Sequence, residues 1–452
     1  MELVSGFSKL SKEQKILWLS KQFQSSKKYD QLDVVKVLRT FQLEDEKMQH
    51  IFDEFSENTM ANFILPFGIA PNFVINQKTY SIPMVVEESS VVAAAAHAAK
   101  FWSSRGGFHT EILGLDKVGQ VHCIFAGPKE LLIQYFQLYK DSLLAAIKPM
   151  ALSMMNRGGG IKNLELIDAS NENIQDYFQL ALTVNTCDAM GANFINTLLE
   201  SLAHNFKESF TQYIKKLNKE DDVKHFEIIM SILSNYTPQS KVKVWVSCKA
   251  EELGSIDGLT AMEFIRKFIT ATEIARNDIS RAVTHNKGIM NGIDAVILAT
   301  GNDFRAVEAC AHAYASRDGQ YRSLSHASFS EDGEFRFEME FPLAIGTVGG
   351  LTKLHPLSKL TLDLLGNPNA QELMQIIVAV GLAQNFSAIR SLITTGIQKG
   401  HMKMHLLNIL QQLHATEVQI ETAKRYFQDK VISYSEVKNF LSQATVEGDR
   451  HA

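Results

Sequence analysis

The amino-acid sequence predicts an α+β protein in which a small antiparallel α/β module is inserted into a larger, helix-rich chain. Between residues 110 and 220, candidate strands and helices alternate in the order ββαββα, which is typical of an antiparallel sheet with helices on one face. Residues 369–452 contain no proline and have the pattern of helices throughout. With 452 residues, 45% of them hydrophobic, the chain can bury a large core, and its length predicts two or three domains.

Composition excludes several classes of partner. The formal net charge of -5 provides no broad basic field, so we expect no nucleic acid. We also expect no membrane, because no apolar run approaches the length that a bilayer needs and the first residues lack the design of a signal peptide. The four cysteines are far apart and form no C-x-x-C pair, which argues against a zinc site or a disulfide framework. We therefore predict a cytoplasmic protein without a metal.

The N-terminal part is predicted to be helical. Ser11 to Gln14 fits a capping box, so a helix should run from about Lys12 to Phe23. Residues 32–55 are predicted to continue as helix. The following stretch, residues 61–77, is punctuated by proline and glycine, and we expect a loop or a short strand there.

Two adjacent acids stand at the next junction between a strand and a helix. Residues 80–86 read as a strand and residues 90–102 as a helix, whose alanine run must pack against a neighbour at short range. Glu87 and Glu88 lie between them. An acid at a helix N-terminus is stabilised by the helix dipole, and this explains one of the two but leaves the other to be explained.

The inserted module contains two glycine-rich turns. Residues 156–160 precede its third strand, and residues 188–191 precede its last helix. Glycines ahead of a helix let the backbone approach a phosphate, so nucleotide binding is possible. A plain turn remains the simpler alternative, because the chain has no G-x-G-x-x-G. The elements predicted for this module are strands 110–115, 120–125, 163–169 and 177–184, a helix 129–146, and a helix from residue 192.

The remaining chain is predicted to return to a larger core. We expect a strand at residues 241–248, a helix at residues 260–277, and a hairpin that turns at Asp332-Gly333. Near the end, Gly396 and Gly400 flank a plausible hinge, beyond which the last residues would form a helical lid.

The stretch from His285 to Ala315 has the layout of a site. Residues 294–300 form a short apolar run rich in β-branched side chains, which predicts a buried strand. Asp303 then precedes a helix and can cap it. Lys287 stands among small and apolar residues with no carboxylate beside it, so a distant group must pair with it. A surface lysine and a capping aspartate are the ordinary alternative.

Several longer motifs occur in a fixed order along the chain. They are ENTMANFILPFGIAPNF from Glu57, PMVVEESSVVAA from Pro83, DAMGAN from Asp188, THNKGIMNGID from Thr284, TGNDFRAVEA from Thr300, GTVGGLTKLHP from Gly346, VGLAQN from Val380 and GIQKGHMKMH from Gly396. With these motifs the chain resembles the bacterial, soluble class II 3-hydroxy-3-methylglutaryl-coenzyme A (HMG-CoA) reductases over nearly its whole length.

The resemblance implies an enzyme that reduces the thioester of HMG-CoA to mevalonate by two hydride transfers, with release of CoA between them. It assigns Lys287 to the cation that stabilises the oxyanion, and Glu88 to the proton donor for that oxygen. Asp303 would hydrogen-bond between these two groups. His401 would protonate the departing thiolate.

The resemblance also implies the binding residues. Arg281 would take the free carboxylate of the substrate through its forked donors. NADPH is the expected cofactor, with NADH as the alternative, because Arg157 beside the glycine run can meet a 2′-phosphate and Ala151 appears where NADH-specialised members carry an acid. The full sets are Ser90, Arg281, Asn291, Gln384 and His405 for the substrate, and Asp188, Met190, Gly191, Asn193 and Arg157 for the cofactor.

The family organisation predicts four segments: a large domain in two parts (1–109 and 221–395), a small ferredoxin-like NAD(P)-binding domain (110–220), and a helical C-terminal flap (396–452). The family's active site lies between subunits, which implies at least a homodimer. Two alternatives stay open: the same chemistry run oxidatively in mevalonate catabolism, and a catalytically silent homologue that binds CoA or a nucleotide.

Overall fold

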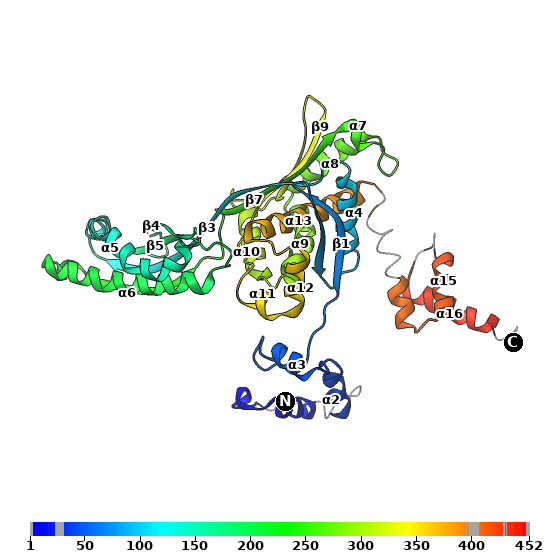
Figure 1. Cartoon of the computed structure of the whole chain (residues 1–452), viewed down its shortest axis with the longest axis horizontal. Coiled ribbons are helices and arrows are strands. Elements are labelled where there is room, and N and C mark those ends of the chain that lie inside the picture. Colours follow the sequence, from blue (N-terminus) through cyan, green and yellow to red (C-terminus); the bar gives the residue numbers. More distant parts are fainter. Residues whose placement is uncertain are drawn as a thin grey trace.

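The computed structural model describes residues 3–22, 31–394, 396, 406–427, 430 and 432–448. It confirms the α+β class, with helices packed on antiparallel sheets (Figure 1). A central body carries a smaller α/β unit on one side, the N-terminal helices below it, and the C-terminal helices on the other side (Figure 1). Short elements not discussed further are η1 (Phe7–Lys9), η2 (Glu220–Asp222), α7 (Ala250–Leu253), α11 (Leu351–Leu354) and α12 (Pro356–Leu364).

The N-terminal helices begin where the sequence places capping residues. Helix α1 (Lys12–Lys21) begins after Ser11, whose side chain and that of Gln14 form the predicted capping box. The helix predicted for residues 32–55 forms, but in two pieces. The chain forms α2 (Gln31–Thr40) and α3 (Glu46–Asp53), because Asp45 caps a new helix by accepting from two backbone N–H groups.

The stretch that contains proline and glycine forms the first strand of a two-stranded antiparallel sheet. Strand β1 (Phe67–Ile75) pairs antiparallel with β2 (Lys78–Val85), and the register shifts between Ala70 and Phe73, around Pro71. Helix α4 (Val91–Ser103) follows β2 as predicted and packs on β1. The turn between β2 and α4 carries Glu88.

One strand links the two sheet regions. Residues 109–126 form a single strand, β3 (His109–Ala126), and not the two strands predicted. Its first part pairs with β7 (Ser240–Lys249) in the central body, and its second part pairs with β5 (Tyr177–Asn185) and β6 (His225–Leu233) in the smaller unit. Gly119, inside β3, makes room for α6, since a Cβ there would lie 2.5 Å from Leu199 Cδ1.

The smaller unit has the strand order β4-β5-β3-β6, and its helices pack on one hydrophobic cluster. Helix α5 runs past its predicted end at residue 146 to Met155, with Pro149 inside it. Strand β6 continues this sheet beyond residue 220, and the domain boundaries stay a prediction. The remaining bounds of this unit are α5 (Lys129–Met155), β4 (Gly160–Asp168) and α6 (Ala192–Lys216).

The central body is built around helix α13, which packs closely against α9. By length and composition alone α13 could cross a membrane, which the sequence analysis did not expect of any segment. However, 72% of its most apolar window is buried inside the fold, as in the core helix of a globular protein. The elements of this body are α8 (Ala261–Asn277), α9 (Ile279–Ala299), α10 (Phe304–Ala315), β8 (Ser325–Phe329), β9 (Glu334–Pro342) and α13 (Ala370–Ile393).

The buried strand predicted at residues 294–300 is wrong, because residues 294–299 lie in α9 and Thr300 is its C-cap. Most side chains in this part of the helix are buried, with Val296 and Ile297 both fully buried, while Asp294 and Leu298 are partly exposed. A helix without a polar face loses the 3.6-residue signal, so its apolar run resembles a strand.

The C-terminal helices form a separate hydrophobic cluster that shares no residue with the core of the central body. They stand to one side of it in Figure 1. They include α15 (Glu417–Tyr426) and α16 (Tyr434–Gly448).

Candidate active site

Glu88 and Lys287 meet from opposite parts of the sequence. Lys287 Nζ on α9 donates a hydrogen bond to Glu88 Oε2 over 2.5 Å, and Asn291 Nδ2, one helical turn further, approaches the same oxygen at 3.4 Å. The lysine side chain is 58% exposed and that of Glu88 is 37% exposed, so a ligand can reach both. The lysine without a carboxylate neighbour in sequence thus has its partner in space.

The backbone next to Glu88 is strained. Ser90, at the N-cap of α4, has a φ of 73°, in the left-handed region that a serine rarely adopts, and its side chain makes no capping bond. Strain of this kind persists where the surrounding structure enforces it, which is common at functional sites.

Behind Lys287, a closed ring of hydrogen bonds fixes α9 against α13 and β8. His285 Nε2 lies 2.6 Å from Ser325 Oγ, Ser325 Oγ donates to Asn385 Oδ1 over 2.7 Å, and Asn385 Nδ2 donates back to the carbonyl of His285 over 3.3 Å. Since the serine proton goes to Asn385, His285 must donate through Nε2–H and its Nδ1 carries the lone pair. Burial lowers the pKa of His285 to about 3, which keeps the ring neutral.

Two groups near this ring lack a partner. Gln384 is 6% exposed, yet its Oε1 is buried without a hydrogen bond, and so is His285 Nδ1. Arg281, earlier on α9, is half-buried, and desolvation lowers its pKa. Buried acceptors without donors are uncommon in folded proteins, so they indicate where donors of a bound molecule are expected.

Asp303 does not join the Lys287–Glu88 pair within this chain. Its Oδ1 accepts from the backbone N–H groups of Arg305 and Ala306 and caps α10, as the ordinary alternative predicted. From Lys287 to Ala299, where α9 ends, the helix rises about 18 Å, so Asp303 lies far from the lysine of its own chain.

Asp303 instead lines a separate groove of about 710 Å³. The groove runs between the N-terminal part of the chain and the start of α10. Phe63 and Ile64 border it and are 94% and 65% exposed, an unusual position for large apolar side chains.

The predicted cofactor residues form a turn that touches both parts of the protein. Asp188 Oδ1 accepts from the backbone N–H of Ala370 at the start of α13, and the Asp188 carbonyl accepts from Thr347 N–H, each over 2.8 Å. Gly191 ends the turn with a φ of 95° and begins α6. Met190 and Asn193 flank it in sequence.

The glycine run before β4 lies beside this turn. A Cβ on Gly159 would meet Cys187 Sγ at 2.6 Å, so the two predicted phosphate-binding segments are neighbours. Arg157 is exposed, and its guanidinium bonds Ser153 in the last turn of α5.

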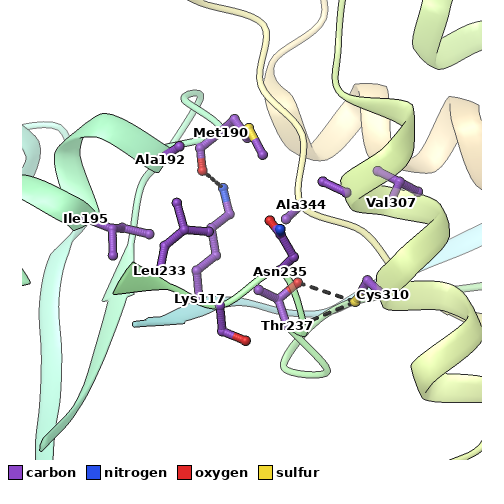
Figure 2. Close-up of a pocket in the computed structure, with 12 residues that line it drawn as sticks. Lys117, Met190, Ala192, Ile195, Leu233, Asn235, Thr237, Val307, Cys310 and Ala344 are labelled. Carbon is purple, nitrogen blue, oxygen red and sulfur yellow. Dashed lines mark hydrogen bonds between the residues drawn. The ribbon is translucent and has the colours of Figure 1, made fainter. Parts of the chain in front are cut away.

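The sequence analysis missed Lys117, a buried lysine that holds the same turn. Its Nζ lies between the smaller unit and α10 and points at the Met190 carbonyl (Figure 2). Only its place inside an otherwise alternating strand could have indicated it.

His401 and His405 lie outside the described residues. Among the residues that the structure describes, no group of three or more His, Cys, Asp or Glu side chains could hold a metal ion.

Comparison with known proteins decides the family. The model of the family described as hydroxymethylglutaryl-coenzyme A reductase matches residues 17–406. The chain belongs to this family. It is 36% identical to the HMG-CoA reductase of Archaeoglobus fulgidus over 374 residues (82% of this chain and 80% of the relative), and 33% identical to a probable HMG-CoA reductase of Borreliella burgdorferi over 403 residues (87% of each).

Solved HMG-CoA reductases share the fold. The class II enzyme of Streptococcus pneumoniae, bound to NADPH in open conformations, aligns with a TM-score of 0.70 at 36% identity and covers 86% of this chain and 100% of its own. A second structure from that organism aligns with a TM-score of 0.71 at 35% identity and covers 98% and 100%. The resemblance found from the motifs is confirmed.

Proposed function

We propose that this chain reduces the thioester of HMG-CoA to mevalonate with two equivalents of NADPH and two protons, releasing CoA. The observation that carries the proposal is the contact of Lys287 with Glu88, together with the Asn291 amide. Negative charge develops on a carbonyl oxygen as hydride arrives, and that oxygen must then gain a proton. A cation and a carboxyl group side by side supply both needs.

This geometry supports the following roles for the residues. Lys287 stabilises the oxyanion, and Glu88, in contact with it, delivers the proton. The unpartnered acceptor of Gln384 and the half-buried guanidinium of Arg281 suit the hydroxyl and carboxylate of the substrate. The thiolate that leaves after the first reduction needs a proton, which the family resemblance assigns to His401.

The cofactor residues fit a phosphorylated dinucleotide. The backbone N–H groups at the start of α6 and the adjacent glycine run offer donors to phosphate, and NADPH supplies the hydride when it is bound. We propose Arg157 as the residue that favours NADPH over NADH. Replacing it with alanine should lower kcat/KM for NADPH and leave kcat/KM for NADH unchanged. Equal values for wild type and variant with NADPH would remove this role.

We further propose that the active enzyme is at least a homodimer and that the Asp303 of a second copy completes each site. Two observations support this: α9 rises about 18 Å between Lys287 and its end, and Asp303 of the same chain lines a separate groove. The exposed Phe63 and Ile64 beside Asp303 are suited to cover by a partner.

Mixed dimers test the shared site. Lys287→Ala and Asp303→Ala should each be nearly inactive alone. Co-expressed at equal levels, they should recover about a quarter of wild-type activity, because half of the dimers are mixed and each of these has one intact site. Absence of recovery, with mixed dimers present by mass spectrometry, would mean that both residues act in the same chain.

Lys287→Ala tests the activity itself. We expect kcat to fall on the order of a hundredfold or more, because an oxyanion stabiliser is lost, while the melting temperature stays the same because the side chain is exposed. The control is Lys100→Ala, an exposed lysine on α4 that should leave turnover unchanged. Normal NADPH oxidation by the Lys287 variant would exclude the proposed reaction.

A further inference from the structure

Lys117 is a buried lysine without a carboxylate partner among the described residues. It is 6% exposed, and its three donors go to neutral acceptors: Thr186 Oγ1 at 2.6 Å, the Ala189 carbonyl at 3.0 Å and the Met190 carbonyl at 2.8 Å. An unpaired buried charge is expensive, so its retention needs a reason.

The Lys117 ammonium lies next to the N-terminus of α6. The carbonyls that it holds belong to the turn just before α6, so the lysine sits at the positive end of a helix dipole. Cation and helix N-terminus repel each other unless an anion shares the site. An anion bound at this place would therefore stabilise both.

No carboxylate pairs with Lys117 in the part of the chain that the structure describes. Beside it lies a cavity of about 20 Å³, lined by the β6–β7 loop, α6 and α10 (Figure 2). The titratable groups that face this region are the thiols of Cys187 on the turn and Cys310 on α10, and the turn's one carboxylate, Asp188, is directed to Ala370 N–H.

We propose that Lys117 is a positioning residue for the cofactor turn, residues 186–190. Its amine takes up a proton when the anionic dinucleotide binds, and the resulting ammonium holds the turn in the binding conformation. The inference rests on the proposed function, because it requires that the phosphates of NADP(H) come close to this turn. Their negative charge then acts as the missing counter-ion.

The hydrogen bonds of Lys117 differ between its protonated and its neutral form. As an ammonium, Lys117 donates three bonds, and the Thr186 hydroxyl is free to donate to the Ala189 carbonyl, as observed over 2.6 Å. As a neutral amine it has two donors and a lone pair, so the Thr186 hydroxyl can turn to the amine and release Ala189. Loss of the proton therefore loosens the turn.

The Lys117 amine gains and loses its proton near neutral pH. Burial lowers the pKa of Lys117 from 10.5 to about 7, with a smaller opposing effect of Cys187. Above this pH the free site is largely neutral. A nearby phosphate raises the pKa again, so binding and proton uptake are linked.

Calorimetry of NADP⁺ binding in buffers of different ionisation enthalpy measures this uptake. At about pH 8, wild type should take up close to one proton per chain, and its Kd should rise as the pH increases above about 7. Lys117→Arg keeps the charge at every pH and can extend into the adjacent cavity, so it should bind NADP⁺ without that uptake and with a flat pH profile.

Two further variants test the loss of the charge and serve as a control. Lys117→Met should bind at least about tenfold more weakly and without uptake, since the charge is lost. Lys129→Met, in the same unit, removes an exposed lysine that pairs with Asp168, and should behave as wild type. If Lys117→Met does not fold, Lys117→Arg carries the test alone.

The contrary outcomes are distinct. Unchanged proton uptake and pH dependence in Lys117→Arg would overturn the inference, because the proton would then go to another group. Binding by wild type without any uptake would overturn it as well, while leaving the proposed function intact. A wild-type chain that binds neither NADP⁺ nor NADPH would remove both.

Discussion

At the scale of single residues, the site depends on buried polar groups that lie behind the catalytic pair. The hydrogen-bonded ring of His285, Ser325 and Asn385 joins α9, which carries Lys287, to α13, which carries Gln384. It holds together only while His285 is neutral, because an imidazolium would place an uncompensated charge in a buried position. The ring therefore links the acid stability of the protein to the geometry of the site.

We expect this link to appear as a pH dependence of stability. The folded pKa of His285, about 3, lies below its ordinary value of 6.5. Between these values the unfolded chain binds a proton that the folded chain does not, so the free energy of unfolding falls as pH decreases, by at most about 1.4 kcal/mol per pH unit. Urea unfolding from about pH 7 to about pH 5 measures the slope.

The variant His285→Asn should reduce that slope, whatever its effect on stability at neutral pH. The control His50→Asn removes an exposed histidine on α3 and should leave the slope as it is. Identical slopes in wild type and the His285 variant would show that other groups govern acid unfolding.

At the scale of elements, the contact of α9 with α13 places the catalytic and substrate-binding side chains. Gly292 makes this contact possible, since a Cβ there would lie 2.8 Å from the Val380 carbonyl oxygen and 2.9 Å from Gln384 Cβ. Gly288, one turn earlier, has no such neighbour, and its nearest atoms would be 3.9 Å away.

The two glycines therefore make a matched pair. Gly292→Ala should lower the free energy of unfolding by about 1–3 kcal/mol through overpacking and raise the KM for HMG-CoA, because Gln384 is displaced. Gly288→Ala should leave stability unchanged or raise it by up to about 1 kcal/mol, as alanine favours the helix. Equal effects of the two substitutions would contradict this account of the helix contact.

Sequence predicted most elements whose ends carry local signals. The capping box at Ser11 marked the start of α1. The helix predicted at residues 260–277 is α8, which begins after the N-cap Thr260. Residues 294–300 were misassigned because an apolar run that is mostly buried loses the helical periodicity. For the site, motifs brought Glu88 and Lys287 to attention, but the role of Lys117 depends on a fold that only the structure shows.

At the scale of the whole molecule, the described parts are units with separate cores. The central body and the smaller unit share the strand β3, and the turn held by Lys117 joins them. The C-terminal helices have their own hydrophobic cluster, so they can move or be removed without opening the main core.

Deleting the chain from His401 onward tests whether the C-terminal part acts as a catalytic flap. We expect the shortened protein to fold and to bind NADPH, because α13 and the cofactor turn remain, while turnover of HMG-CoA falls strongly through loss of His401 and of water exclusion. Its reduction of free mevaldehyde, which has no thiolate to protonate, should suffer less than that of the thioester. The point variant His401→Gln in the full chain separates the two losses: it should impair only the thioester reaction. A truncated chain that fails to fold would show that the C-terminal helices support the core, and equal loss on both substrates in His401→Gln would show that this histidine has another role.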